Sequence, residues 1–453
     1  MNKKILTAGL CTILINFFSA GILFPQSMTQ KWMAGFNGTS YSANARTLSV
    51  SADDAGNIYF TGAGNDSPDF YTVKYNPEGV QLWTAKYDGP GNSEDVPGSI
   101  AVSKTGSVYV AGDSYGSGTS SDFTTVKYNP EGIQQWVARY DGPKNDNDVA
   151  SSVALDSSGN VYVTGYCKGK ASGFDFTTIK YDSSGKQLWK ATYNGPGNDD
   201  DIAKYITVSA SGDIFVSGYS VGSGSSHDYA VIKCDSDGRQ QWVARYNGPG
   251  NGQDETSAII TDEAGNVYVT GYSKGTGTEL DYCTIKYNAA GVLQWTARYN
   301  GKGNMEDAAY SIALDGAGSV YVTGISYTGK KTGQDYVTVK YSSAGVQEWT
   351  AVYNGSGNGP DFAKSMTIDN NGNVCVTGFS EGIGSSADFT TLIYNSAGVL
   401  QSETRYKGAS KSEDFAYDIL ADSSGNIYVA GFSVNSKADG KKNAKYVLIK
   451  YSK

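Results

Sequence analysis

The chain has 453 residues, of which 57 are glycine, so glycine makes up about 13% where about 7% is usual. Aromatic residues make up 12% and charged residues only 18%, which excludes an intrinsically disordered protein. With 45 acidic against 36 basic residues and a net charge of −9, the chain lacks the positive charge of a nucleic-acid-binding protein.

The first 24 residues have the pattern of a secretory signal peptide. Residues 1–4 form a short basic start, and residues 5–24 form an apolar run without a charge. We expect cleavage between residues 21 and 27, which leaves residues 31–453 as a single domain. An uncleaved membrane anchor is the alternative, because the apolar run is nearly long enough to span a bilayer.

Tryptophan recurs at intervals of 51 to 54 residues and marks an internal repeat. The seven positions are Trp32, Trp83, Trp136, Trp189, Trp242, Trp295 and Trp349. One further step leads to Ser402, and the segment 399–402 otherwise matches the segment 292–295 around Trp295. The period therefore runs through the whole chain after the signal, and the eighth unit carries serine in place of tryptophan.

Each unit predicts four strands, as residues 151–193 illustrate. A short stretch at 153–155 is followed by runs at 161–165, 175–181 and 187–193. These runs are rich in Val, Ile, Thr, Tyr and Phe and are separated by Gly, Asn and Asp, while no segment has a helical period. We refer to them as the first, second, third and fourth strands of a unit. A glycine between the first and second strands of every unit, such as Gly159, suits a hairpin turn that needs a positive φ.

Repeated four-stranded units of about 50 residues predict a β-propeller, in which each unit forms one blade around a central channel. Trp32 belongs to a fourth strand that precedes any first strand, whereas the chain ends at Lys453, just after a third strand. The N-terminal strand can therefore complete the last blade and hide the edges that an open array would expose. We predict an all-β propeller of eight four-stranded blades closed in this way; seven blades plus a spare unit is the alternative.

A family resemblance rests on segments such as 262–271 (DEAGNVYVTG), Asp281-Tyr282 and 297–301 (ARYNG). Segments of this kind resemble the bacterial beta-propeller repeat family abbreviated SBBP, over about 420 residues in eight copies. The name of the family implies seven blades, whereas this chain has eight units. The resemblance implies a protein that is secreted, periplasmic or on the bacterial cell surface, without a defined activity and with no catalytic residues to transfer.

An aspartate recurs twelve residues after the tryptophan position in seven units, with Asn44 in the remaining one. The series is Asp95, Asp148, Asp201, Asp254, Asp307, Asp361 and Asp414. Because it precedes the innermost strand, we expect it near one mouth of the channel. Two interpretations stay open: each carboxylate accepts backbone N–H groups of its own connection, or the ring binds a cation such as calcium.

Other notable residues favour structural roles. We expect the tryptophans to pack between neighbouring sheets, with a sugar-stacking platform as the alternative. His227, the only histidine, is predicted in a solvated loop. Lysine recurs on the third strand and predicts a solvated or ion-paired stripe; the series is Lys74, Lys127, Lys180, Lys233, Lys286, Lys340 and Lys450, with Ile393 in the other unit.

Four cysteines outside the signal segment neither recur in register nor cluster. Cys167, Cys234, Cys283 and Cys375 each appear in one unit only. A disulfide framework would recur and a metal site would cluster, so we predict four buried small residues.

We expect a non-enzymatic binding or scaffolding protein that recognises a protein or glycan partner through one face. It would act as a monomer, without nucleic acid and without membrane insertion after signal cleavage. The variable loops between the second and third strands, from 63–68 to 432–444, are candidate recognition sites, although drift at unconstrained turns explains them equally well. The alternatives are a hydrolase, lyase or quinone-dependent enzyme on the same scaffold, or a structural envelope or matrix component. No catalytic or cofactor-binding residue is predicted.

Overall fold

The structure is a computed structural model that describes residues 28–40, 48–64, 68–329, 332–409, 412–436 and 442–452. The predicted signal segment 1–24 and its cleavage region 21–27 lie outside the described residues. Strands and turns make up the described chain, which contains no helix and therefore none long and apolar enough to cross a membrane.

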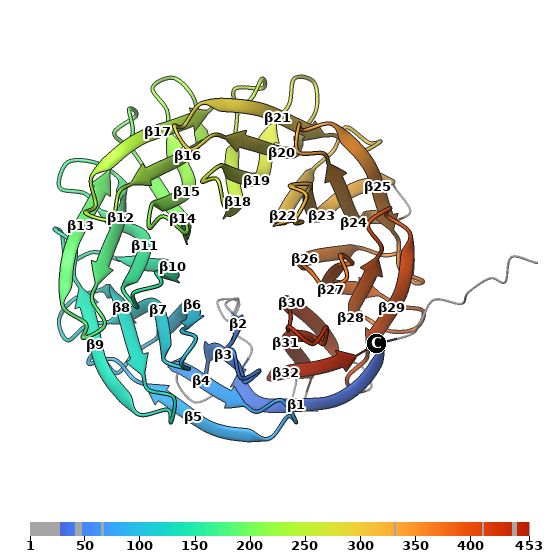
Figure 1. The fold of residues 1–453 in the computed structure, drawn as a ribbon, viewed down its shortest axis with the longest axis horizontal. Coiled ribbons are helices and arrows are strands. Elements are labelled where there is room, and N and C mark those ends of the chain that lie inside the picture. Colours follow the sequence, from blue (N-terminus) through green and yellow to red (C-terminus); the bar gives the residue numbers. More distant parts are fainter. Residues whose placement is uncertain are drawn as a thin grey trace, which may run out of the picture.

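Eight antiparallel sheets of four strands each are arranged in a ring (Figure 1). Blade 1 is β2 (Ser49–Ala52), β3 (Ile58–Ala63), β4 (Phe70–Tyr75) and β5 (Gln81–Tyr87). Blade 2 is β6 (Asp95–Val102), β7 (Val108–Tyr115), β8 (Ser121–Tyr128) and β9 (Gln134–Tyr140). Blade 3 is β10 (Val149–Leu155), β11 (Val161–Lys168), β12 (Phe174–Tyr181) and β13 (Gln187–Tyr193). Blade 4 is β14 (Asp201–Val208), β15 (Ile214–Val221), β16 (His227–Cys234) and β17 (Gln240–Tyr246).

The second half of the ring repeats this order. Blade 5 is β18 (Asp254–Thr261), β19 (Val267–Lys274), β20 (Leu280–Tyr287) and β21 (Leu293–Tyr299). Blade 6 is β22 (Asp307–Leu314), β23 (Val320–Gly329), β24 (Gly333–Tyr341) and β25 (Gln347–Tyr353). Blade 7 is β26 (Asp361–Ile368), β27 (Val374–Glu381), β28 (Ala387–Tyr394) and β29 (Leu400–Tyr406). Blade 8 is β30 (Glu413–Ala421), β31 (Ile427–Ser436), β32 (Lys442–Ser452) and β1 (Thr29–Ser40).

The ring is closed by the N-terminal strand. In blade 8 the strand order is β30-β31-β32-β1, and Trp32 of β1 lies opposite Lys450 of β32. The two ends of the chain thus share one sheet, as Figure 1 shows where blue meets red. The predicted eight-bladed, N-terminally closed propeller is confirmed, and the alternative of seven blades plus a spare unit is wrong.

The hydrophobic core lies between the blades. Val161 and Val163 of blade 3, for example, are fully buried in one cluster with Tyr109 and Ala111 of blade 2. Because the middle strands of a blade are covered on both faces, they read as continuous apolar runs. Each fully buried side chain of this size contributes about 1.5–3 kcal/mol, so the packing of blade on blade is the main source of stability.

The repeated tryptophan and lysine join each blade to the next. Trp189 Nε1 in blade 3 donates a hydrogen bond to the carbonyl of Ser236 in blade 4, at 2.9 Å. The ammonium of Lys180 binds the same carbonyl at 3.0 Å and lies 5.0 Å from the ring centre of Tyr162. The tryptophan therefore packs between sheets as predicted. The prediction of a solvated or ion-paired lysine stripe is confirmed for Lys233 and Lys340, which pair with Asp213 and Glu348 at 2.9 Å. It is wrong for Lys180, because the neighbouring turn binds its ammonium group.

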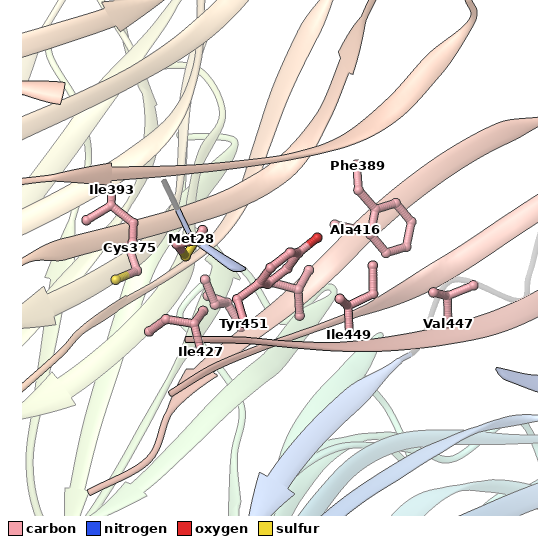
Figure 2. Packing of buried hydrophobic residues seen from close by; sticks show 11 residues of the cluster. Met28, Cys375, Phe389, Ile393, Ala416, Ile427, Val447, Ile449 and Tyr451 are labelled. Carbon is pink, nitrogen blue, oxygen red and sulfur yellow. The ribbon is translucent and has the colours of Figure 1, made fainter. Parts of the chain in front are cut away.

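The one unit that lacks both residues lies where the ring closes. Blade 8 has no turn between its third and fourth strands, because β32 ends the chain and β1 begins it. Blade 7 therefore has no carbonyl to bind, and it carries Ile393 and Ser402 instead of lysine and tryptophan. Met28 packs against Ile393 and Cys375 (Figure 2), and its N–H donates to Ser402 Oγ at 3.3 Å. Met28 thus fills the space that a turn fills elsewhere.

The four cysteines are buried thiols. Cys167, Cys234, Cys283 and Cys375 form no disulfide in the part of the chain that the structure describes. Burial raises the pKa of the Cys283 thiol to about 12, so this cysteine stays a neutral, unreactive thiol at physiological pH. The prediction of buried small residues is confirmed.

Candidate functional site

The predicted acidic series lies at one end of the blades, where the innermost strands begin. The register of each sheet puts the start of the innermost strand beside the end of the second strand; in blade 5, Asp254 lies opposite Ser273. The connections from each outermost strand to the next blade reach this same end. We call this end of the ring the connection face.

Each aspartate of the series holds its own connection in place. All seven are fully buried. In blade 5, Asp254 Oδ2 accepts the N–H of Gly248 at 2.6 Å, and Oδ1 accepts the N–H of Lys274 at 3.1 Å. Burial raises the pKa of Asp254, which these backbone donors partly offset. The geometry thus matches the first interpretation, in which each carboxylate fixes its own connection.

A second aspartate, on the third strand of the preceding blade, lies near each of these carboxylates. In blade 4 this residue is Asp228, whose Oδ2 is 2.8 Å from the guanidinium of Arg245. Arg245 also donates to the Ser220 carbonyl at 3.0 Å. Equivalent ion pairs occur in four other blades: Lys86–Asp69, Arg139–Asp122, Arg298–Asp281 and Arg405–Asp388. The carboxylates at the blade junctions are thus partly neutralised by the outermost strands.

His227 is not in a solvated loop, so that prediction is wrong. It is the first residue of β16, and its ring stacks on Tyr219 with 4.1 Å between ring centres. His227 Nδ1 lies 3.0 Å from Glu255 Oε1 in blade 5. The other carboxylate oxygen of Glu255 binds the ammonium of Lys204 at 2.6 Å. Residues from blades 4 and 5 thus form one polar cluster, which we call the His–Glu cluster.

Electrostatics keep Glu255 ionised although only 8% of it is exposed. Burial by itself would raise the pKa of Glu255, but the charge of Lys204 and hydrogen bonds from Lys204, His227 and Tyr272 bring it below its ordinary value. Burial and the nearby Glu255 charge raise the pKa of Tyr219 to about 12. The cluster therefore presents a carboxylate, an ammonium group and neutral phenols side by side.

Aromatic side chains occupy the same end of blades 7 and 8. Phe362 stacks on Phe379 at 4.9 Å, Phe379 meets Phe415 edge-on at 4.8 Å, and Phe415 lies 5.4 Å from Phe432. Tyr417 stacks on Phe432 at 5.2 Å. We call these five residues the aromatic row. In Figure 1 their inner strands β26 and β30 lie on the other side of the axis from β14.

A lysine extends the aromatic row toward blade 6. The ammonium of Lys364 lies 4.6 Å from the ring centre of Tyr310 and 5.4 Å from that of Phe362. Lys204 and Lys364 each occupy a bulge of the innermost strand, between residues paired in register with the second strand. Such a bulge re-aims a side chain, which brings both lysines onto the neighbouring blades.

These residues come from three positions of the unit at which the repeat breaks down. The residue after the repeated aspartate is Val96, Val149, Ile202, Glu255, Ala308, Phe362 or Phe415. The residue after the second-strand glycine is Ala63, Asp113, Tyr166, Tyr219, Tyr272, Ile325, Phe379 or Phe432. The bulged residue is Gly98, Ser151, Lys204, Ser257, Tyr310, Lys364 or Tyr417. Variation next to the repeated aspartate and the repeated second-strand glycine was the signal in the sequence, and the sequence analysis missed it.

Two groups of carboxylates are placed to hold a metal ion. In the described residues, Asp69, Asp88 and Asp95 bring ligand oxygens within 4.8 Å of one another, and so do Asp122, Asp141 and Asp148. Both groups lie at blade junctions of the connection face. They include two members of the predicted acidic series, each combined with partners from the preceding blade.

Family comparison identifies the repeat. The model of the family described as SBBP, beta-propeller repeat, matches residues 136–169, 241–277 and 404–433. The chain carries SBBP beta-propeller repeats. Each matched segment begins in the outermost strand of one blade and ends in or just after the second strand of the next blade. The resemblance found in the sequence is confirmed at these three places.

More distant similarities concern the fold. An uncharacterized WD repeat-containing protein of Acanthamoeba polyphaga mimivirus is 23% identical over 29% of this chain, and the chain spans only 13% of that protein. Among solved structures, virginiamycin B lyase from Staphylococcus aureus is 11% identical with a TM-score of 0.44, covering 92% of this chain and 98% of the lyase. Polysaccharide lyase Uly1 is 12% identical with a TM-score of 0.45, covering 93% and 98%.

Proposed function

We propose that this SBBP-repeat propeller is a secreted binding protein that holds a glycan at the connection face, between the aromatic row and the His–Glu cluster. The observation that carries the proposal is that positions where the repeat breaks down bring aromatic rings of blades 7 and 8 into contact and place a carboxylate, a lysine and a histidine together in blades 4 and 5. A purely structural ring needs the same residues in every unit, whereas a binding site needs different chemistry from each blade.

The aromatic row supplies flat apolar surface. Phe362, Phe379 and Phe415 are only partly buried, so their rings are within reach of a ligand. Binding sites are commonly lined by aromatic side chains with a few placed polar groups. The apolar C–H face of a sugar ring suits such a surface.

The His–Glu cluster supplies the polar groups. Glu255 accepts hydrogen bonds, Lys204 donates them, and His227 remains 26% exposed at its side chain. Mutual contacts hold these groups in place before a ligand arrives, which reduces the entropy lost on binding. Hydroxyl groups of a glycan can bind to both the acceptor and the donor.

The test is a glycan array with the mature chain, residues 28–453. Glu255→Ala and Phe379→Ile import the residues that the sixth blade carries at these positions, Ala308 and Ile325, so the fold should tolerate them. Each should weaken binding about tenfold or more, which corresponds to about 1.4 kcal/mol. Leu188→Ala, on the exposed outermost strand, is the control and should bind normally. Binding that survives both connection-face variants would contradict the proposal, and capture of a protein alone would favour a protein ligand.

A second candidate is an enzyme acting on the same ligand, and the His227–Glu255 contact favours it. A carboxylate that holds one imidazole nitrogen orients the ring, and the other nitrogen is then the one to exchange a proton with substrate. In a panel of glycans, turnover abolished by His227→Gln while binding persists would establish an enzyme. Binding without turnover by the unaltered chain would support the non-enzymatic proposal.

Location and assembly follow from the same proposal. We expect the protein to act as a monomer. We expect it in the periplasm, on the bacterial cell surface or outside the cell, because the sequence starts like a secretory signal. Fractionation of cells that express the full chain, with N-terminal sequencing of the product, checks both the location and the cleavage between residues 21 and 27. A matrix or envelope component without a specific ligand would fractionate in the same way but bind nothing in the array.

A further inference from the structure

The two carboxylate groups of the connection face are equivalent positions of neighbouring units, 53 residues apart in sequence. Asp69, Asp88 and Asp95 correspond to Asp122, Asp141 and Asp148. Five of the other units carry asparagine at the middle position: Asn37, Asn194, Asn247, Asn300 and Asn354. A third carboxylate therefore distinguishes these two junctions from their relatives.

In the first group, the ammonium group of a lysine side chain already lies among the carboxylates. Lys86 Nζ lies 2.7 Å from Asp69 Oδ2 and 3.5 Å from Asp88 Oδ2. One ammonium group thus bridges two of the three carboxylates. This arrangement marks the place as one where a positive charge is stabilised.

The second group has a different counterion. Arg139 replaces the lysine, and its guanidinium pairs with Asp122 Oδ2 at 2.8 Å. The same guanidinium also donates to Ser114 Oγ at 2.6 Å and to the Tyr87 hydroxyl at 3.0 Å. Among the described residues, no ion pair joins it to Asp141. Three carboxylates therefore share one positive charge.

Two oxygens of this second group are buried without a partner. Asp122 and Asp148 are 4% and 0% exposed, and the Oδ1 atom of each is buried with no hydrogen bond among the described residues. A buried carboxylate oxygen without a partner is costly.

We propose that Asp122, Asp141 and Asp148 bind one calcium ion between blades 2 and 3. Calcium takes carboxylate oxygens at about 2.3–2.6 Å, so two of its ligands lie up to about 5 Å apart, which matches oxygens within 4.8 Å of one another. Magnesium holds its ligands at about 2.1 Å and needs a tighter group. Asp141 is exposed, so the ion can enter from solvent.

The test is calcium binding by the mature chain, measured by isothermal titration calorimetry and by melting temperature. We expect one ion per chain and a melting temperature that rises with calcium, because a ligand of the folded state stabilises it. Asp141→Asn should lower the calcium affinity about tenfold or more. It should leave the calcium-free melting temperature unchanged, since sister units carry asparagine there.

Two variants of the first group complete the experiment. Asp88→Asn is the matched control and should bind calcium like the unaltered chain, because Lys86 occupies that junction. Lys86→Thr imports the residue of the third unit, Thr192, and should create a second site with two ions per chain. Absence of calcium binding, binding that Asp141→Asn does not weaken, or a single ion in Lys86→Thr would each overturn the proposal.

Discussion

Single charged residues at the connection face link the strands of one blade and reach the preceding blade. Arg245 pairs with Asp228, of which 5% is exposed, and its guanidinium also reaches Ser220 and Tyr193. In the third blade Thr192 takes the place of this arginine, and its partner position, Asp175, is less deeply buried. Burial of the aspartate does not depend on the cation alone, since Asp335 in blade 6 is 1% exposed although Val352 stands at the arginine position.

Removing the arginine alone should be costly. Arg245→Thr leaves Asp228 buried without its cation and should lower the free energy of unfolding by about 2–3 kcal/mol. The double variant Arg245→Thr, Asp228→Asn should lose less, because no buried charge remains unpaired. Urea denaturation of both variants measures this difference, and equal losses would contradict the role assigned to the ion pair.

Asp113 should make the stability of the protein depend on pH. It follows the second-strand glycine of blade 2, where blade 4 carries Tyr219. Burial raises the pKa of Asp113 to about 7, and the charges of Glu94 and Asp95 add to the shift. The folded chain keeps a proton that the unfolded chain releases near its ordinary pKa of 3.8. Stability contributed by this residue is therefore complete below that value and is lost as the pH rises through 7.

Asp113→Asn removes this proton linkage. The variant should melt at a higher temperature than the unaltered chain near pH 7.5 and at about the same temperature near pH 4. Thermal unfolding of both proteins at the two pH values makes the comparison, in which other titrating groups cancel. A stabilisation that is the same at both pH values would show that proton release by Asp113 is not its cause.

At the scale of strands and turns, the outermost strand of one blade and the turn of the next form a joint. Gly238 lies in the turn of blade 4 with φ at +81°, and a Cβ atom there would meet the ring of Trp189 at 2.6 Å. Gly212, in another turn of the same blade, has a similar φ of +83° but open space around it. The first glycine is thus required both by its backbone and by the tryptophan, the second by its backbone alone.

Alanine at the two glycines should separate these effects. Gly212→Ala should cost about 1–2 kcal/mol of unfolding free energy, the penalty of a left-handed backbone. Gly238→Ala should cost at least about 1 kcal/mol more, because the tryptophan must move. Chemical denaturation provides both values, and equal costs would mean that the tryptophan contact contributes little.

For the molecule as a whole, closure of the ring depends on β1. Without it, β32 would present an unpaired edge, and Trp32 Nε1 could not bind the carbonyl of Pro77 in blade 1, at 2.9 Å. Met28 would also leave the cluster around Ile393 and Cys375. Blade 8 would then lose its outer strand and the contacts that Trp32 and Met28 make with blades 1 and 7.

Deletion of residues 28–40 should therefore cause aggregation or a large loss of stability, since an open sheet edge pairs with other chains. Size-exclusion chromatography and thermal unfolding of the truncated chain test this. The mature chain with Met33→Ala, an exposed position of β1, serves as the control. A soluble, monomeric truncation with an unchanged melting temperature would contradict the closure.

The number of blades and the closure could be predicted from the sequence because they rest on local patterns repeated eight times. Strand runs, turn glycines and the phase of Trp32 against the end of the chain depend on neighbours in sequence. The substitutions Ile393 and Ser402 were visible too, but their reason was not. They reflect a turn that is missing in the next blade, which is apparent only once the ring is closed.

The candidate site depended on the tertiary structure. His227 and Glu255 are 28 residues apart and lie in different blades, and Phe379 meets Phe415 in the same way. Contacts of this kind depend on how one sheet packs on the next and on the bulge that turns Lys204 toward its neighbour. A periodic pattern fixes which residues face inward, but the packing of whole blades decides which of them meet.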